Sequence, residues 1–166
     1  MAQDPGRRRT PLVVVVTGPE CTGKTTLAAE LGARYEAPVS GEYARAYQAT
    51  REETLTREDV GPIARGQLRG EDEARAAATR LVVADTDLVS TMIYSRHYYG
   101  TCPAWIESAA RSRRADLYLL LAPDVPWIAD GLQRDRPFGR EELYREFREA
   151  LAGLGARTVE VSGDWP

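Results

Sequence analysis

Apolar runs bounded by turn residues recur along this chain, and the stretches between them are long enough to form helices. Runs of this length and order are typical of buried strands that alternate with helices in an α/β protein. We assign strands to residues 12–16, 38–40, 81–84, 117–122 and 158–161. The pattern therefore predicts an α/β fold of three layers, in which a five-stranded, mostly parallel sheet carries helices on both faces.

Helical composition fills much of the intervening sequence. Thr56, followed by acidic residues, is typical of a helix cap, and the alanine-rich, charged segment behind it predicts a long surface helix that ends near residue 79. We expect a bend in it near Gly61 and Pro62. Further helices are predicted over residues 25–31, 103–113 and 141–151, and the last of these carries an apolar stripe with helical spacing.

The loop between the first strand and the first helix carries the clearest chemical signal. Residues 18–25 match the phosphate-binding pattern G-x-x-x-x-G-K-[ST] in full. Lys24 is the only lysine of the chain. Its ammonium group is compact, whereas the planar guanidinium of arginine would crowd phosphates packed against backbone amides. We therefore expect a nucleoside triphosphate site, and a chance glycine-rich turn is the alternative.

Each residue type in this loop suits the binding of ATP and Mg²⁺. Gly18 and Gly23 permit backbone conformations that are closed to other residues, so that the amides behind them converge on phosphate oxygens. Lys24 is expected to bridge the β and γ phosphates, and the Thr25 hydroxyl to bind Mg²⁺. The residues that we assign to ATP are Gly18, Glu20, Cys21, Thr22, Gly23, Lys24, Thr25 and Thr26, together with Arg134 from a later loop.

Two carboxylates follow the third predicted strand. Asp85 comes directly after residues 81–84, so it should emerge at the carboxyl edge of the sheet, where it can hold the metal or its waters. Asp87 lies one pleat further on and is expected on the acceptor side. Each has an alternative role, because an aspartate after a strand readily caps a helix.

The end of the second strand predicts the acceptor side of the site. There Glu42 is placed to accept a proton from an acceptor hydroxyl, Arg45 to steady an oxygen near the reacting phosphate, and Tyr43 to stack on a flat ring. The same stretch is also ordinary for the start of an exposed helix, and that alternative stays open.

A loop after the fourth strand, residues 126–140, combines arginines with glycine and proline. We expect it to close over phosphates, with Arg136 and Arg140 neutralising charge that develops in the transition state. An arginine-rich surface turn is the alternative. His97, the only histidine, is expected to end a helix, because phosphoryl transfer on this kind of scaffold does not require imidazole.

Composition narrows the classes of protein that fit. A chain of 166 residues suits a single domain, which we place at residues 12–166 behind a flexible basic tail of residues 1–11. The body is more acidic than the net charge of −3 suggests, so no nucleic-acid partner is expected. No apolar run is long enough for a membrane span or a signal peptide. The two cysteines are expected to be reduced thiols, and the protein is expected in the cytoplasm.

Several blocks of sequence resemble one known family. Residues 18–25, 42–47, 84–88, 116–121 and 126–132, in this order and spacing, look like the ribosylnicotinamide kinase domain of the NadR-type NAD-biosynthesis proteins. The resemblance covers about residues 12–165. It implies ATP-dependent phosphorylation of the 5′-hydroxyl of nicotinamide riboside to give nicotinamide mononucleotide, on a fold similar to nucleoside and nucleotide kinases.

The resemblance also implies roles for single residues. Lys24 and Thr25 would serve ATP and Mg²⁺, and Asp85 either the metal or the proton of the acceptor. A tyrosine or tryptophan should sandwich the cationic pyridinium ring. The residues assigned to the nucleoside pocket are Glu42, Tyr43, Arg45, Tyr47, Asp87, Trp127 and Asp130, and those assigned to catalysis are Lys24, Glu42, Asp85, Arg136 and Arg140.

Other interpretations stay open at this point. One is a kinase of the same fold that acts on another small nucleoside or nucleotide. Another is a non-catalytic switch that senses ATP or a pyridine nucleotide, although a GTPase switch is disfavoured because the chain has no asparagine for the guanine-reading motif. Larger family members carry further domains ahead of this one, for which we expect no room here. The sequence stops where the family usually adds a last helix, and whether its absence is natural is left open. A homo-oligomer is left open.

Overall fold

Five strands form one sheet in the computed structural model, which describes residues 10–127 and 139–163. They are β1 (Leu12–Thr17), β2 (Val39–Ser40), β3 (Leu81–Asp85), β4 (Leu117–Leu121) and β5 (Thr158–Val161). Their order is β2-β3-β1-β4-β5, and every neighbouring pair runs parallel. The expected sheet is confirmed, and most of the predicted tail, residues 1–9, lies outside the described residues.

Six α-helices and one 3-10 helix accompany these strands in the described ranges. They are α1 (Lys24–Tyr35), α2 (Tyr43–Ala49), η1 (Arg57–Asp59), α3 (Val60–Ala77), α4 (Leu88–Tyr99), α5 (Ala104–Ser112) and α6 (Arg140–Gly153). The helix expected from Thr56 is divided into η1 and α3, and the predicted cap is confirmed, because Thr56 and Asp59 form a capping box. None of these helices is long and apolar enough to cross a membrane.

Helix α4 lies in a stretch for which the sequence predicted only a helix end at His97. Its buried residues are Leu88, Val89, Ser90, Met92, Ile93 and Ser95, which are spread around the helix axis instead of forming one stripe. Other helices surround α4, since α3, α5 and α6 all pack against it. A helix that is buried on several sides lacks the amphipathic period by which surface helices are identified.

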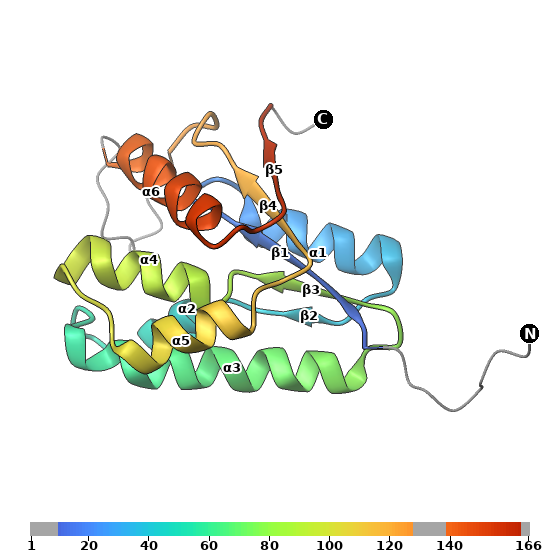
Figure 1. Cartoon of the computed structure of the whole chain (residues 1–166), viewed down its shortest axis with the longest axis horizontal. Helices are drawn as coiled ribbons and strands as arrows, with labels where there is room; N and C mark the ends of the chain where they lie inside the picture. The colour runs from blue at the N-terminus through green and yellow to red at the C-terminus, as the bar shows by residue number, and fades with distance from the viewer. Residues whose placement is uncertain (1–9, 128–138, 164–166) are drawn as a thin grey trace, which may run out of the picture.

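The sheet separates two hydrophobic clusters. On one face Val13 and Val15 of β1 pack in a large cluster with apolar residues of helices α3 to α6, including the fully buried Phe147. On the other face Val16 packs with Ala28 of α1. Because side chains alternate along a strand, the apolar run of β1 serves both clusters at once. Helices therefore cover both faces, as expected, and Figure 1 shows how α1 and the group of α3, α4 and α5 are arranged about the sheet.

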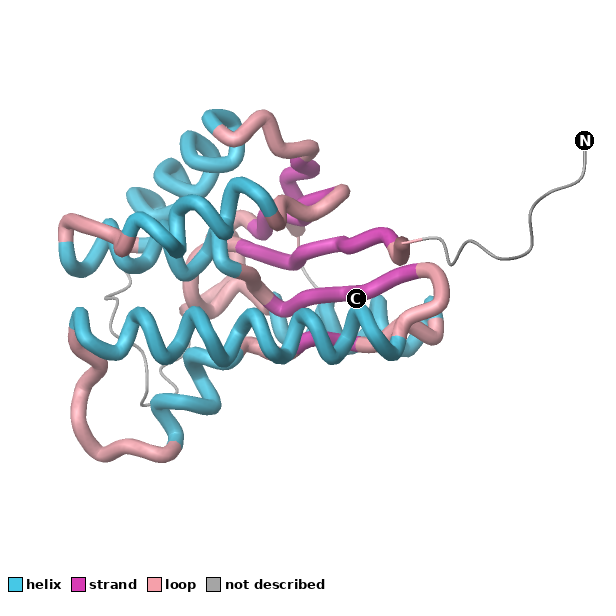
Figure 2. Tube along the Cα trace, turned by 60° about the horizontal axis from the view of Figure 1, so that its bottom comes forward, coloured by secondary structure: helices cyan, strands magenta, loops and turns pink. Residues whose placement is uncertain are grey.

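Parallel strands bring the chemistry to one edge. The chain that leaves β1 forms the phosphate loop, the chain that leaves β2 enters α2, and the chain that leaves β3 enters α4. Figure 2 shows the loops that follow β1 and β3 meeting at one end of the strands. In open α/β sheets this carboxyl edge is where ligands bind.

Candidate active site

The phosphate loop joins β1 to α1 through an unusual backbone. Gly18 has a φ of 136° and Gly23 a φ of 85°, which L side chains rarely adopt. A Cβ atom on Gly18 would also come within 2.7 Å of the Leu121 carbonyl oxygen, so no other residue fits there. Cys21 takes a left-handed conformation with a φ of 53° although it is not glycine. Left-handed residues in such a loop turn successive N–H groups toward one point, which suits an anion.

Lys24 is the first residue of α1, and only 8% of its surface is exposed. Its Nζ donates a hydrogen bond of 2.6 Å to the carbonyl oxygen of Pro19. The Thr22 hydroxyl donates to the same oxygen at 2.9 Å. Burial lowers the pKa of Lys24, and the nearby carboxylates of Glu42, Asp85 and Glu20 oppose that shift. These three carboxylates favour the charged form of Lys24. A charged ammonium group at this position can offset the negative charge of a polyphosphate.

Thr25 and Asp85 meet at the edge of the sheet. The Thr25 hydroxyl donates a hydrogen bond of 2.6 Å to Oδ2 of Asp85, which is 2% exposed. The other carboxylate oxygen of Asp85 is buried and has no hydrogen-bond partner. Burial raises the pKa of Asp85, and the bond from Thr25 counteracts this.

This pair fits Mg²⁺. A buried carboxylate oxygen without a partner calls for a cation or an ordered water, and Mg²⁺ prefers oxygen ligands. No group of three or more His, Cys, Asp or Glu side chains in the described residues could hold a metal alone. Mg²⁺ commonly binds one or two protein oxygens and completes its shell with water and substrate phosphates, so two protein ligands suffice.

A cavity lies next to the phosphate loop, between helices α2, α3 and α4, and we call it the acceptor cavity. Glu20 and Lys24 of the phosphate loop line one end of it. Glu42 and Arg45 line it from the start of α2, and their side chains form an ion pair of 3.6 Å. The contribution of α4 consists of Ser90, Thr91, Tyr94, Ser95, Tyr98 and Tyr99.

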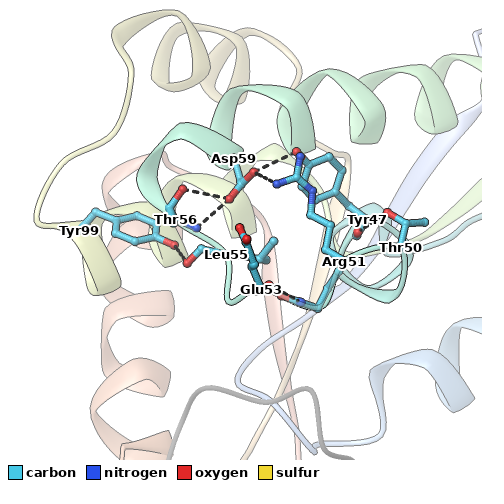
Figure 3. Close-up of polar contacts among 9 residues, drawn as sticks. Tyr47, Thr50, Arg51, Glu53, Leu55, Thr56, Asp59 and Tyr99 are labelled. Atoms are coloured by element: carbon cyan, nitrogen blue, oxygen red, sulfur yellow. Dashed lines mark hydrogen bonds and ion pairs between the residues drawn. The ribbon is translucent and has the colours of Figure 1, made fainter.

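Leu55 and Thr56 form one wall of the acceptor cavity, and the carboxylate of Asp59 holds Thr56 (Figure 3). Asp59 accepts hydrogen bonds from the backbone N–H of Thr56 at 2.8 Å and from the Thr56 hydroxyl at 3.0 Å. Tyr47 and Arg51 donate to its other oxygen, each at 2.9 Å. These bonds lower the pKa of Asp59, that from the Thr56 backbone most of all. The wall is therefore held by hydrogen bonds within the protein.

The tyrosines of α4 are site residues that the sequence analysis missed. Tyr94 and Tyr98 stack with ring centroids 6.0 Å apart and an interplanar angle of 11°. Their hydroxyls donate to the phosphate loop, Tyr94 to the Gly18 carbonyl and Tyr98 to the Glu20 carboxylate, both at 3.4 Å. The hydroxyl of Tyr99 donates to the carbonyl of Leu55 at 3.1 Å. The available signal was the density of aromatic residues at helical spacing in residues 94–99.

Three aromatic residues assigned to the nucleoside pocket do not line the acceptor cavity. Tyr43 packs its ring against Gly66 of α3, where a Cβ atom would overlap it. The Tyr47 hydroxyl is bound to Asp59. Trp127 has a buried indole N–H without a hydrogen-bond partner. Of the residues predicted for this pocket, the structure thus places Glu42 and Arg45 at the cavity, while Asp130 lies outside the described residues.

Asp87 also lies elsewhere than predicted. It caps α4, and its Oδ1 accepts hydrogen bonds from the N–H groups of Val89 at 3.0 Å and Ser90 at 3.2 Å. Its Oδ2 accepts a hydrogen bond of 2.8 Å from the Tyr118 hydroxyl. Both oxygens are therefore satisfied by protein donors, and the alternative role as a helix cap is the one observed.

The arginines of the loop after β4 are only partly within the described residues. Arg134 and Arg136 lie outside them. Arg140 is the first residue of α6 and is 8% exposed. Its guanidinium group donates to backbone carbonyls on both sides, to Cys21 in the phosphate loop and to Pro123 and Val125 after β4. The structure thus shows Arg140 bound to the protein backbone, and its predicted role toward the transferring phosphate stays a prediction.

Comparison with known proteins places this site in context. A sequence model described as AAA domain matches residues 13–166. The trifunctional NAD biosynthesis/regulator protein NadR of Escherichia coli K12 is 31% identical over 145 residues, which are 85% of this chain and 35% of that protein. The corresponding protein of Salmonella typhimurium is 32% identical over the same length. The chain therefore spans about a third of the curated relatives it matches.

Solved structures give the same relationship. A NadR protein in complex with NR superimposes with a TM-score of 0.77 at 27% identity, covering 95% of this chain and 47% of that one. A NadR protein in complex with NAD and AMP-PNP gives a TM-score of 0.73 at 26% identity, covering 95% and 45%. Thymidylate kinase from Ehrlichia chaffeensis superimposes with a TM-score of 0.65 at 13% identity, and the match covers 92% of this chain and 89% of that one. This likeness shows a shared fold.

Proposed function

The chain belongs to the AAA domain family, and we propose that it is a kinase that transfers the γ-phosphoryl group of ATP to the 5′-hydroxyl of nicotinamide riboside. The product is nicotinamide mononucleotide. One observation carries the proposal: Lys24 and Glu20 of the phosphate loop also line the acceptor cavity. A hydroxyl group bound in that cavity lies beside the phosphates bound by the loop, and such proximity is a large part of phosphoryl-transfer catalysis.

The relatives support this choice of substrates. One solved NadR structure holds NR and another holds NAD and AMP-PNP, which is an analogue of ATP. We assign the same ligands to this chain because both NadR structures superimpose on 95% of it. The curated relatives are trifunctional and about three times longer, so only the activity that the present site can carry is proposed here.

Glu42 is the residue that we assign to the proton of the acceptor hydroxyl. Its carboxylate lines the acceptor cavity, whereas Asp85 does not and is bound to Thr25 instead. As the 5′-oxygen attacks the γ-phosphorus, its proton passes to Glu42, and the bond from the γ-phosphorus to the β–γ bridging oxygen breaks to release ADP. Arg45 keeps the Glu42 carboxylate oriented through their ion pair.

The phosphate loop, the Thr25 hydroxyl and the Asp85 carboxylate are the groups that we assign to the phosphates of ATP. Lys24 and the loop amides hold the β and γ phosphates in line with the acceptor. Thr25 and Asp85 would hold Mg²⁺, which when bound neutralises charge on the phosphate oxygens. On the acceptor side the tyrosines of α4 offer electron-rich faces to a cationic pyridinium ring, a contact worth roughly 0.5–2 kcal/mol.

Release of ADP from ATP and Mg²⁺, with and without nicotinamide riboside, tests the proposal. We expect release that depends on the nucleoside, and we expect Lys24→Met to reduce it by roughly three orders of magnitude or more. Lys24→Arg should be similarly inactive, because the planar group does not fit the loop. Arg34→Met, at an exposed position in the last turn of α1, is the matched control and should keep full activity.

A panel of acceptors separates this proposal from its rivals. Turnover of thymidine or of a mononucleotide, with none of nicotinamide riboside, would reassign the chain to another kinase of the same fold. Tight binding of ATP without release of ADP in the presence of any acceptor would make it a non-catalytic nucleotide sensor.

A further inference from the structure

Arg140 is a buried cation that contacts no carboxylate among the described residues. Its Nη1 donates to the carbonyl oxygen of Cys21 at 3.1 Å, and its Nη2 donates to those of Pro123 at 3.0 Å and Val125 at 2.8 Å. Its Nε is buried without a hydrogen-bond partner. Burial of a guanidinium group among neutral acceptors costs free energy. We therefore expect the geometry that Arg140 imposes on these carbonyls to have a function.

The contact with Cys21 has a geometric consequence for the phosphate loop. In a planar trans peptide the C=O and N–H groups point in opposite directions. A donor that holds the Cys21 carbonyl therefore also directs the N–H of Thr22 away from Arg140. Cys21, whose carbonyl accepts this bond, has a φ of 53°, which is unfavourable for a residue with a side chain.

The contacts of Arg140 with Pro123 and Val125 fix its guanidinium group to the segment that follows β4. Pro123 and Val125 follow β4, whose residues Tyr118 and Leu120 are fully buried in the core. Arg140 thus ties the phosphate loop to a segment that continues directly from the centre of the sheet. Since a lysine has a single nitrogen on a flexible stem, it cannot hold carbonyls on both sides in this manner.

We propose that Arg140 is a positioning residue for ATP, which fixes the Cys21–Thr22 peptide in the orientation that the phosphates require without contacting them. The inference rests on the proposed function only in that the loop binds ATP, and it does not depend on which acceptor is used. Preorganisation of this kind improves affinity because the loop does not have to be ordered when ATP binds.

Calorimetric titration of the full chain with ATP and Mg²⁺ provides the test. We expect Arg140→Met to weaken ATP binding by about tenfold or more and Arg140→Lys to weaken it nearly as much, because the forked geometry and not the charge is needed. Where the reaction is measured, the KM for the acceptor should stay within about twofold, as Arg140 does not line the acceptor cavity. Arg148→Met, on the exposed side of α6, is the control. If Arg140→Met does not fold, Arg140→Lys carries the test.

A second pair of variants addresses the mechanism directly. Cys21→Gly in the Arg140→Lys background should recover much of the lost ATP affinity, because glycine adopts positive φ without strain. Cys21→Ala in the same background should recover none. Wild-type ATP affinity in Arg140→Lys, or equal effects of Cys21→Gly and Cys21→Ala, would overturn the proposal. Failure of the proposed function can be told apart from failure of this proposal. It would appear as missing turnover of nicotinamide riboside, while the differences in ATP affinity among the variants remained as expected.

Discussion

The hydroxyl of Tyr118 donates a 2.8 Å hydrogen bond to Oδ2 of Asp87, and this bond joins β4 to the first turn of α4. Both residues are buried, since Tyr118 is 0% and Asp87 7% exposed. Burial raises the pKa of both groups. The Tyr118 hydroxyl also accepts from the N–H of Ala115 at 3.2 Å. The N-cap of α4, the helix that carries the cavity tyrosines, is thus bound to β4 across the core.

Tyr118→Phe should destabilise the protein while leaving its chemistry intact. The change removes a buried donor and leaves Oδ2 of Asp87 and the N–H of Ala115 without this partner, which should lower the free energy of unfolding by about 1–3 kcal/mol. Urea titration measures this loss. Tyr144→Phe is the matched control, because Tyr144 donates to Glu160 in an exposed contact and should change stability by less than about 1 kcal/mol. Equal effects of the two changes would contradict the prediction.

Asp85 and Asp87 are two residues apart and should respond in opposite ways to substitution by alanine. Asp85→Ala removes one hydrogen bond, from Thr25, but also a buried carboxylate whose other oxygen has no partner, so we expect stability to change by less than about 1 kcal/mol and turnover to fall at least roughly 100-fold. Asp87→Ala removes a helix cap and the bond from Tyr118, so we expect a loss of about 2–3 kcal/mol. The folded fraction of Asp87→Ala should keep turnover near that of the wild type. Urea titration with initial rates decides, and the reverse result would exchange the two roles.

Gly66→Ala should weaken acceptor binding without touching the acceptor cavity. A Cβ atom at this position of α3 overlaps the ring of Tyr43, the first residue of α2, and must displace it. Glu42 and Arg45 move with that helix end, so the KM for the acceptor should rise by about tenfold while the KM for ATP changes little.

Gly61→Ala, on the same helix, is the control for Gly66→Ala. Outside the backbone of its own helix and its chain neighbours, the one atom of the described residues within 4 Å of its added Cβ is Nη1 of the flexible Arg65 side chain, at 3.2 Å. It should keep both KM values and gain a little stability, because alanine favours helices over glycine by up to about 1 kcal/mol. A rise in acceptor KM in this variant too would show that the effect comes from α3 in general.

Glu71 should make the stability of the protein depend on pH near neutrality. It is 6% exposed, and burial, together with the nearby Asp87, raises its pKa from 4.5 to about 7 against the influence of Arg113 and Arg75. Between these values the native state holds a proton that the unfolded chain releases. The free energy of unfolding should therefore fall as pH rises from about 4.5 to about 7, by roughly 3 kcal/mol.

Glu71→Gln tests this dependence, because it removes the titrating group and should flatten the profile measured by urea titration across that range. Asp72→Asn is the control, since the exposed Asp72 pairs with the same arginine, Arg113. A slope that disappears in Asp72→Asn and persists in Glu71→Gln would assign it to the exposed pair.

The phosphate side of the site could be predicted from sequence because its determinants are local or follow from the topology. The loop is one contiguous segment between a strand and a helix. The meeting of Thr25 with Asp85 follows from a parallel register in which Val16 lies opposite Asp85. Once β1 and β3 are recognised as neighbours, their carboxyl ends must lie side by side.

The acceptor side could be predicted only in part, since its determinants come from distant elements. Tyr43 and Tyr47 stand beside Glu42 in sequence, yet their partners are Gly66 and Asp59 on other helices. No local pattern distinguishes a tyrosine that faces a cavity from one that packs on a glycine. For Asp87 a cap and a ligand contact look alike in sequence, and only the buried hydroxyl of Tyr118 decides between them.

The hydrogen bonds from Tyr94 and Tyr98 to the phosphate loop mean that the two proposed substrates would not bind to independent surfaces. A nucleoside that shifts either ring also shifts the donor that the ring presents to the loop, and phosphates that move the loop alter the ring in return. Thermodynamic linkage requires the two influences to be equal, so any gain in nucleoside affinity caused by ATP is matched by the same gain in ATP affinity caused by the nucleoside.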